Sequence, residues 1–164
     1  MVQVSAFGLE SARCLAGRAS NASGSLLPLS HDRARVLATS SSFRLGPTRW
    51  LVVDSAVDED ALLRRFSDIA ADVAALMPFG HGRVVLRLSG EPAAVVLSKG
   101  CAIDLHRRTF PENAFAQTLL DRVPVLLTRI GSADVFDLYV PRSYAMHVRE
   151  CLLDAAAEFG IFTD

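Results

Sequence analysis

The sequence predicts an α+β fold in which helices pack against a mostly antiparallel sheet. The predicted segments follow the order strand, strand, helix, strand, short helix, three strands and helix. This order lacks the strict strand–helix alternation of a doubly wound parallel sheet. The chain has 164 residues, of which 51% are hydrophobic. That length suits one domain, and the composition supplies a core and excludes intrinsic disorder.

The composition of the first 30 residues predicts that they are separate from the folded domain. Small residues dominate residues 5–30, and neither helical nor strand periodicity survives around Ser20–Ser25. Residues 1–30 are therefore expected to be an extended arm or linker, and residues 31–164 a single domain. Two alternatives stay open for the first segment: a frayed terminus, or an arm that becomes ordered against a partner.

The first half of the domain is predicted to hold two strands and the clearest helix. Residues 34–45 and 49–54 are typical of strands, with a turn at Gly46–Pro47. Acidic residues at 58–60 suit a helix N-terminus through capping and the helix dipole. The apolar residues that follow recur at steps of three and four, as on one helix face: Leu62, Phe66, Ile69, Val73 and Leu76. This helix is expected to end at Pro78 and Gly80.

The second half is predicted to hold four strands and two helices. Residues 82–88 alternate between apolar and polar side chains, as a half-buried strand does, and a short helix follows from Pro92 to Gly100. Residues 115–120, 124–130 and 135–140 are the remaining strands. The last helix is expected from about Ser143 to Gly160.

The charge, the apolar runs and the cysteines of the sequence indicate which partners and which cellular compartment to expect. The 17 Lys and Arg residues against 18 Asp and Glu residues give a net charge of −1, so no nucleic-acid partner is predicted. The apolar runs are too short for a membrane span, the start does not resemble a signal peptide, and no membrane partner is expected. Three widely separated cysteines, Cys14, Cys101 and Cys151, indicate a cytoplasmic protein without a disulfide framework.

The chain is predicted to carry no catalytic, metal-binding or confident cofactor-binding residue. The histidines are interpreted as lacking the i, i+4 spacing of helical metal ligands, and no close pair of histidines or cysteines is identified. Gly80–Gly82 lies between a helix and a strand, the reverse of the order in a phosphate-binding loop. Cys101, close in sequence to Lys99 and His106, is weighed as a nucleophile, but the simpler role of a small buried cysteine is favoured.

A polar cluster at residues 99–111 is the candidate subunit-docking loop. Two interpretations of it stay open: a loop whose charged side chains make charge-assisted contacts with a partner or an anionic ligand, and a solvated loop with Leu105 and Phe110 in the core. The single Trp50 is expected in the core rather than at an interface. The candidate docking residues are Lys99, Asp104, His106, Arg107, Arg108 and Phe110.

Residues from about 44 to 160 resemble the gamma subunits of heterotetrameric sarcosine oxidases, which are relatives of the folate-binding aminomethyltransferase of the glycine cleavage system. The most specific match is Lys99–His106, with the sequence KGCAIDLH, and a further match is Leu45–Val53, with the sequence LGPTRWLVV. Arg107 departs from the pattern, since a proline is expected there. The resemblance implies an α+β fold like the folate-binding domain of aminomethyltransferases.

The resemblance also implies a non-catalytic subunit of a flavin-dependent complex. That complex demethylates sarcosine oxidatively to glycine, with hydrogen peroxide and with formaldehyde or methylenetetrahydrofolate as products. The implied partners are alpha, beta and delta subunits that hold FAD, FMN, NAD, tetrahydrofolate and zinc, while this chain alone binds none of them. Three alternatives stay open: a stand-alone folate-binding module, a small aminomethyltransferase, or a gamma subunit of a related complex for another N-methyl amino acid or betaine. Asp54 and Asp104 are the acids to inspect for a folate pocket.

Overall fold

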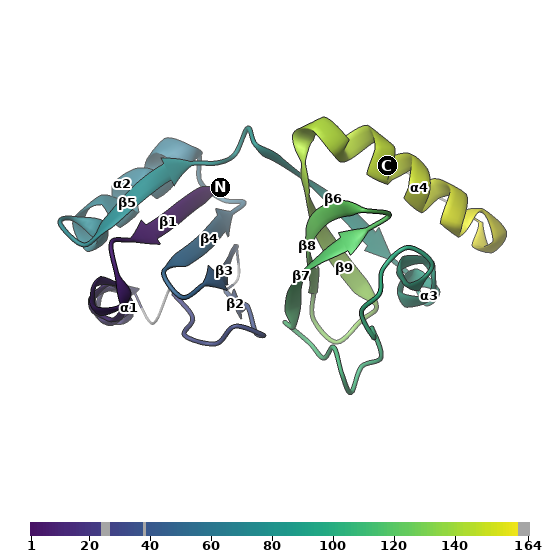
Figure 1. Ribbon diagram of the computed structural model, residues 1–164, viewed down its shortest axis with the longest axis horizontal. Coiled ribbons are helices and arrows are strands. Elements are labelled where there is room, and N and C mark those ends of the chain that lie inside the picture. The colour runs from purple at the N-terminus through teal and green to yellow at the C-terminus, as the bar shows by residue number, and fades with distance from the viewer. Residues whose placement is uncertain (24–26, 38, 161–164) are drawn as a thin grey trace. The chain divides into compact units, whose positions relative to one another are not determined.

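The computed structural model describes residues 1–23, 27–37 and 39–160. The chain divides into two compact units, Met1–His81 (unit 1) and Gly82–Asp164 (unit 2). Each unit contains an antiparallel sheet with helices packed against it (Figure 1), which confirms the predicted α+β class. Among the described residues, no helix is both long and apolar enough to span a membrane.

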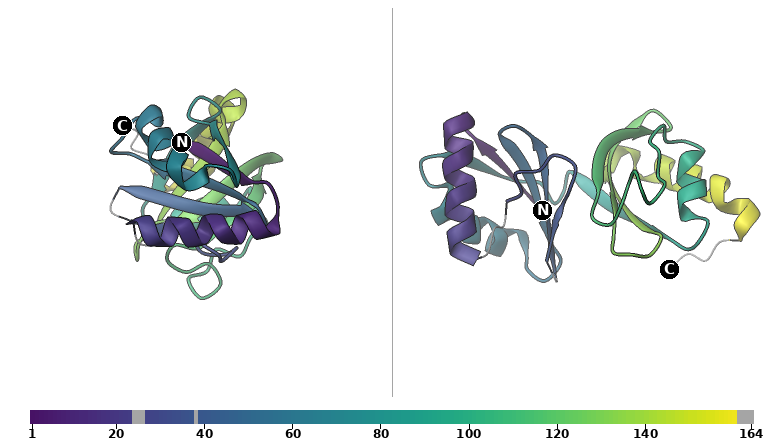
Figure 2. Two further views of the ribbon diagram at one scale, coloured as in Figure 1. Left: turned by 90° about the vertical axis from the view of Figure 1, so that its left-hand side faces the viewer. Right: turned by 90° about the horizontal axis from the view of Figure 1, so that it is seen from below.

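Unit 1 is built on a five-stranded sheet with the strand order β2-β3-β4-β1-β5. Its strands are β1 (Val2–Ala6), β2 (Arg35–Val36), β3 (Ser40–Gly46), β4 (Arg49–Asp54) and β5 (Ala74–Pro78), and its helices are α1 (Leu9–Ser23) and α2 (Glu59–Ala70). Both helices lie on one side of the sheet (Figure 2). The core between these layers includes Leu15 of α1, Trp50 of β4 and Phe66 of α2. Trp50 is fully buried, as predicted, and its indole Nε1 donates to the carbonyl oxygen of Pro28 at 2.9 Å.

The prediction of an extended arm over residues 1–30 is wrong for Val2–Ala6 and Leu9–Ser23. The first segment is an inner strand that pairs with β4 on one side and β5 on the other, and the second is a helix. The strand depends on partners about 45 to 75 positions away, which local periodicity cannot reveal. In α1 the buried face is made mostly of alanines, at Ala12, Ala16 and Ala19 around Leu15, so the helical period was present but weak.

The predicted helix from residue 58 also ends earlier than expected. Asp58 caps α2 by accepting the backbone N–H of Ala61 at 2.7 Å, and the helix ends at Ala70 because Ala71 adopts a positive φ of 30°. Val73 and Leu76 continue the apolar spacing by coincidence. Leu76 belongs to β5, where it pairs with Val4 of β1. Leu76 therefore belongs to the sheet rather than to the helix, and Val73 lies in the turn between α2 and β5.

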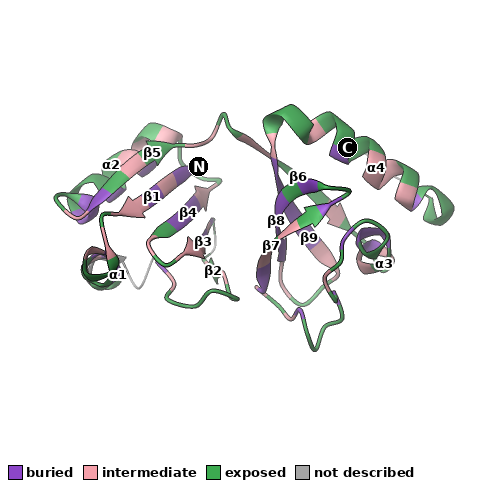
Figure 3. Cartoon of the chain, in the orientation of Figure 1, coloured by how far each residue is buried: buried purple, intermediate pink, exposed green. Residues whose placement is uncertain are grey.

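Unit 2 has a four-stranded sheet with the order β6-β9-β8-β7. Its elements are β6 (Arg83–Ser89), α3 (Ala93–Ser98), β7 (Phe115–Leu120), β8 (Val123–Arg129), β9 (Val135–Pro141), a 3₁₀ turn (Arg142–Tyr144), α4 (Ala145–Ala156) and a second 3₁₀ turn (Ala157–Phe159). Leu97 of α3 and Val148 of α4 are fully buried in a core with Phe136 and Leu138 of β9. Figure 3 shows that the strands of this sheet carry buried residues, whereas much of α4 is exposed. The four predicted strands of this half are confirmed within one residue at either end.

Candidate functional site

The loop between α3 and β7, which contains all six predicted docking residues, is organised by one buried arginine. Arg129, the last residue of β8, is 2% exposed. Its Nε donates to the carbonyl oxygen of Phe110 at 2.8 Å, and its Nη2 donates to the carbonyl oxygen of Leu105 at 2.6 Å. Its guanidinium also lies over the ring of Phe136, 4.5 Å from the centroid. A single side chain from the sheet thus fixes two points of the loop backbone.

Asp134 completes this arrangement by joining Arg129 to an exposed arginine of the loop. Its carboxylate lies 2.5 Å from Nη1 of Arg129 and 3.0 Å from Nη2 of Arg107. Arg107 Nη1 also donates to the carbonyl oxygen of Ser132 at 2.6 Å. Hydrogen bonds from Arg107 and then Arg129 hold the pKa of Asp134 below its ordinary value, so this carboxylate stays charged at neutral pH.

The outer part of the docking loop is a tight turn that exposes charged side chains. The Asp104 carboxylate accepts the backbone N–H of His106 at 2.9 Å, and this bond, followed by one from Thr109, lowers the pKa of Asp104. His106, Arg107 and Arg108 are exposed, whereas Leu105 and Phe110 are about 5% exposed. The loop is therefore anchored by its apolar residues and presents its cationic ones, and its role in docking stays a prediction.

The structure assigns Lys99 to a different neighbourhood from the rest of the predicted docking set. Its Nζ donates to the carbonyl oxygen of Ala155 at 2.5 Å and forms an ion pair with Glu158. The same ammonium lies over the ring of Phe159, 5.2 Å from the centroid. Lys99 thus connects the end of α3 to the end of α4 and helps to hold two helices together.

The remaining residues considered from the sequence have local structural roles. Cys101 is 6% exposed, and its sulfur lies 3.7 Å from the hydroxyl of Thr118, which supports the small buried cysteine over the nucleophile. Asp54, in unit 1, accepts the backbone N–H of Ala56 at 2.9 Å. Asp104, in unit 2, holds the turn described above. Each of these two carboxylates therefore has a local structural role in its own turn.

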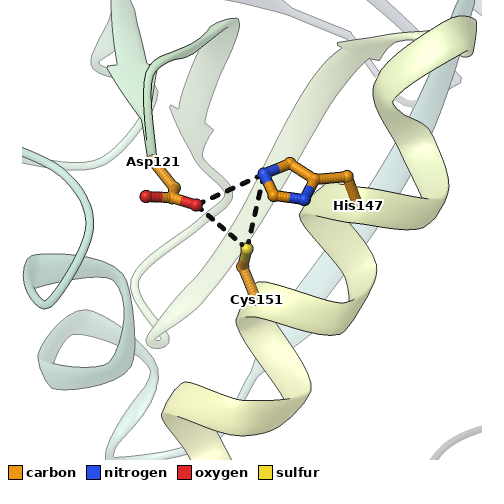
Figure 4. A group of neighbouring side chains, drawn as sticks. All are labelled: Asp121, His147 and Cys151. Carbon is orange, nitrogen blue, oxygen red and sulfur yellow. Dashed lines mark hydrogen bonds and ion pairs between the residues drawn. The ribbon is translucent and has the colours of Figure 1, made fainter.

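A cluster on the surface of unit 2 brings together Asp121, His147 and Cys151 (Figure 4). Asp121 lies in the turn between β7 and β8, and the other two residues lie one turn apart on α4. Asp121 Oδ2 is 3.2 Å from Nε2 of His147 and 3.2 Å from the sulfur of Cys151, and the sulfur is 3.7 Å from the same Nε2. The hydrogen bond to Asp121, then burial and the nearby carboxylate charges raise the pKa of the Cys151 thiol.

This cluster corrects the interpretation that no close pair of histidine and cysteine exists. His147 and Cys151 are four positions apart, which places both side chains on one face of a helix. The signal was therefore present in the sequence. The third member, Asp121, could not be found in this way because only the packing of α4 against the sheet brings the β7–β8 turn beside the helix.

Comparisons with known proteins connect the whole chain to one group. The family model described as the GCVT N-terminal domain matches residues 17–163. Sarcosine oxidase subunit gamma from Corynebacterium sp. (strain U-96) is 34% identical over 117 residues, which are 71% of this chain and 56% of that relative. The subunit of the same name from Arthrobacter sp. is 43% identical over 79 residues, or 48% of this chain and 38% of the relative. The chain therefore spans little more than half the length of the first relative and less of the second.

Two solved structures share the fold. A chain of the heterotetrameric sarcosine oxidase from Corynebacterium sp. U-96, in complex with pyrrole 2-carboxylate, matches with a TM-score of 0.83 and 27% identity, over 99% of this chain and 82% of that one. The glycine cleavage system aminomethyltransferase T from Bartonella henselae matches with a TM-score of 0.62 and 20% identity, over 93% of this chain and 42% of that one. The second likeness extends to the fold alone.

Proposed function

The chain belongs to the GCVT N-terminal domain family, and on that premise we propose that it is the non-catalytic gamma subunit of a heterotetrameric, flavin-dependent sarcosine oxidase. The observation that carries the proposal is the match to a chain of such a complex along nearly the whole length of this one. The curated relatives named as gamma subunits support the same assignment.

In this proposal the chain acts in the cytoplasm as one of four unlike subunits. The partners are alpha, beta and delta subunits, which hold FAD, FMN, NAD, tetrahydrofolate and zinc. The complex converts sarcosine to glycine, with hydrogen peroxide and with formaldehyde or methylenetetrahydrofolate as the other products. A related complex that acts on another N-methyl amino acid or betaine would use the same subunit role, because the substrate pocket lies on another chain.

The loop between α3 and β7 is the surface that we assign to docking. Arg129 fixes its backbone from inside the unit, so the exposed His106 and Arg108 are presented from a rigid support. Interfaces gain specificity and speed of association when such charged groups meet opposite charges on the partner. An arginine is well suited to this role because its planar guanidinium can bind a carboxylate through two hydrogen bonds.

Co-purification from cells that make the complex tests the proposal. A tagged chain should bring down larger partners with the visible absorbance of flavin, and the purified assembly should produce hydrogen peroxide from sarcosine. Isolation of this chain as a colourless, folate-binding monomer would contradict the subunit role and would favour a stand-alone folate module or a small aminomethyltransferase.

A pair of charge-reversal variants tests the docking loop separately. Arg108→Glu should lower the yield of co-purified partners, because it places a negative charge in the exposed part of the loop. Arg64→Glu, on the exposed face of α2, is the matched control and should leave the yield unchanged. Equal yields from both variants would remove the loop from the interface without affecting the subunit assignment.

A further inference from the structure

We propose that Asp121, His147 and Cys151 form a surface site for one Zn²⁺ ion, with the fourth position taken by water. The cluster joins a carboxylate, an imidazole and a thiol, and the ligand atoms of all three lie within 4.8 Å of one another. Sulfur and imidazole ligands together select zinc over magnesium or calcium, which prefer oxygen ligands. The inference is independent of the proposed subunit role, since it rests on this chain alone.

The spacing of the three ligand atoms matches one face of a zinc tetrahedron. Zinc bonds of about 2.0–2.2 Å to nitrogen and oxygen and about 2.3 Å to sulfur place neighbouring ligand atoms about 3.3–3.6 Å apart at tetrahedral angles. The observed separations are 3.2 Å between Asp121 Oδ2 and His147 Nε2, 3.2 Å between Asp121 Oδ2 and Cys151 Sγ, and 3.7 Å between Cys151 Sγ and His147 Nε2. A metal ion can therefore enter with shifts of only a few tenths of an ångström.

The way the groups converge distinguishes a metal site from a catalytic triad. In a cysteine–histidine–aspartate triad the thiol and the carboxylate meet opposite nitrogens of the imidazole: one nitrogen takes the proton of the thiol, and the carboxylate orients the ring through the other. Here both groups approach the same nitrogen, Nε2 of His147 (Figure 4). All three groups point at one location, which is the geometry that a shared cation requires.

The backbone holds the three ligands in place from two elements. Asp121 and Arg122 form the tight turn between β7 and β8, with φ angles of 45° and 68°, and the backbone N–H of Asp121 donates to the carbonyl oxygen of Gly100 at 3.0 Å. The helix α4 is fixed to the sheet by Val148, which is fully buried next to His147. Pre-positioned ligands reduce the conformational entropy that is lost when the metal binds.

Titration of the purified full chain with Co²⁺ and with Zn²⁺ tests the site. Because the chain is titrated without its partners, the zinc expected in a partner subunit does not contribute to the signal. One equivalent of Co²⁺ should give a tetrahedral spectrum with a thiolate-to-cobalt charge-transfer band, and Zn²⁺ should displace it. Asp121→Asn and His147→Gln should each weaken Zn²⁺ binding at least about tenfold, since removal of even an outer-shell partner costs about 10- to 100-fold. Cys151→Ser should abolish the charge-transfer band.

Cys14→Ser is the matched control because Cys14 is a free cysteine that lies outside the cluster, exposed on α1. This variant should keep both the band and the affinity. Two results would overturn the proposal: absence of a charge-transfer band in the wild-type chain, or a band that survives in Cys151→Ser. Asp121 and His147 are exposed and Cys151 is only partly buried, so circular dichroism should show that each variant is folded. If the chain is obtained only within its complex, the zinc content per complex should fall by one in Cys151→Ser.

Discussion

Replacement of Arg129 by methionine tests whether one buried guanidinium organises the loop between α3 and β7. Methionine keeps most of the length and apolar volume of the arginine stem. The substitution removes the hydrogen bonds to the carbonyl oxygens of Leu105 and Phe110 and the ion pair with Asp134. It also removes the cation above the ring of Phe136.

The expected loss is about 3–5 kcal/mol of unfolding free energy, the range for breaking a buried ion pair by removing one partner. Asp134 keeps Arg107 as a second partner, which moderates the penalty on the carboxylate. The two backbone carbonyls each lose the donor that Arg129 supplies, and leaving a buried acceptor unsatisfied costs about 1–3 kcal/mol for each group. Arg129→Lys should recover only part of the loss, because an ammonium cannot reproduce the arrangement of the guanidinium donors.

Urea-induced unfolding followed by far-ultraviolet circular dichroism measures the effect, since the single Trp50 lies in the other unit. Arg108→Met, in the exposed part of the same loop, is the control and should change stability by less than about 0.5 kcal/mol. The reasoning is refuted if the unfolding free energy of Arg129→Met lies within about 1 kcal/mol of the wild-type value, which is on the order of the contribution of one ordinary hydrogen bond.

Three further predictions concern pH, glycine and the buried indole. The pKa of Asp134 is lowered in the folded chain, so its contribution is present above the unfolded-state pKa of about 3.9 and is lost as the pH falls through the folded value; Asp134→Asn should flatten the acid limb of a stability–pH curve. Gly17→Ala, in the interior of α1 with open space at the Cβ position, should stabilise the protein by about 0.5–1 kcal/mol. Gly90→Ala should destabilise it by about 1–3 kcal/mol, because Gly90 has a φ of +122°. Thermal unfolding of both variants checks this contrast. Trp50→Phe should cost about 1–3 kcal/mol in urea unfolding, because it removes the hydrogen bond to Pro28 and leaves part of the core unfilled.

The sequence predicted the second half of the fold more accurately than the first. In unit 2, β7, β8 and β9 pair with strands adjacent in the chain, and turn residues mark their boundaries. The remaining strand, β6, pairs with the distant β9, but its alternation of apolar and polar side chains identified it as a strand. In unit 1 the inner strand β1 pairs with β4 and β5, and nothing within its own five residues indicates those partners. Its position in the sheet was therefore missed, together with the strand character of β5.

The predicted docking residues also show that the sequence does not reveal contacts between residues far apart in the chain. The charged composition of residues 99–111 pointed to a loop that presents cations, and the exposure of His106 and Arg108 agrees with this. Lys99 was grouped with them by proximity in sequence, but it pairs with Glu158 across a separation of 59 residues. Arg129 was not singled out, because its importance comes from burial among backbone carbonyls that lie 19 to 24 positions away.

The sequence by itself determined the α+β class, the strands of unit 2, the start and apolar face of α2, and the resemblance to one family, because these are encoded in local composition, period and motif. Only the tertiary structure decided which strands become neighbours, which arginine is buried, and that Asp121 reaches the helix of His147 and Cys151. The physical reason is that strand pairing, ion-pair burial and ligand convergence depend on contacts between residues far apart in the chain. Their energies arise only when the sheet and helices have packed together.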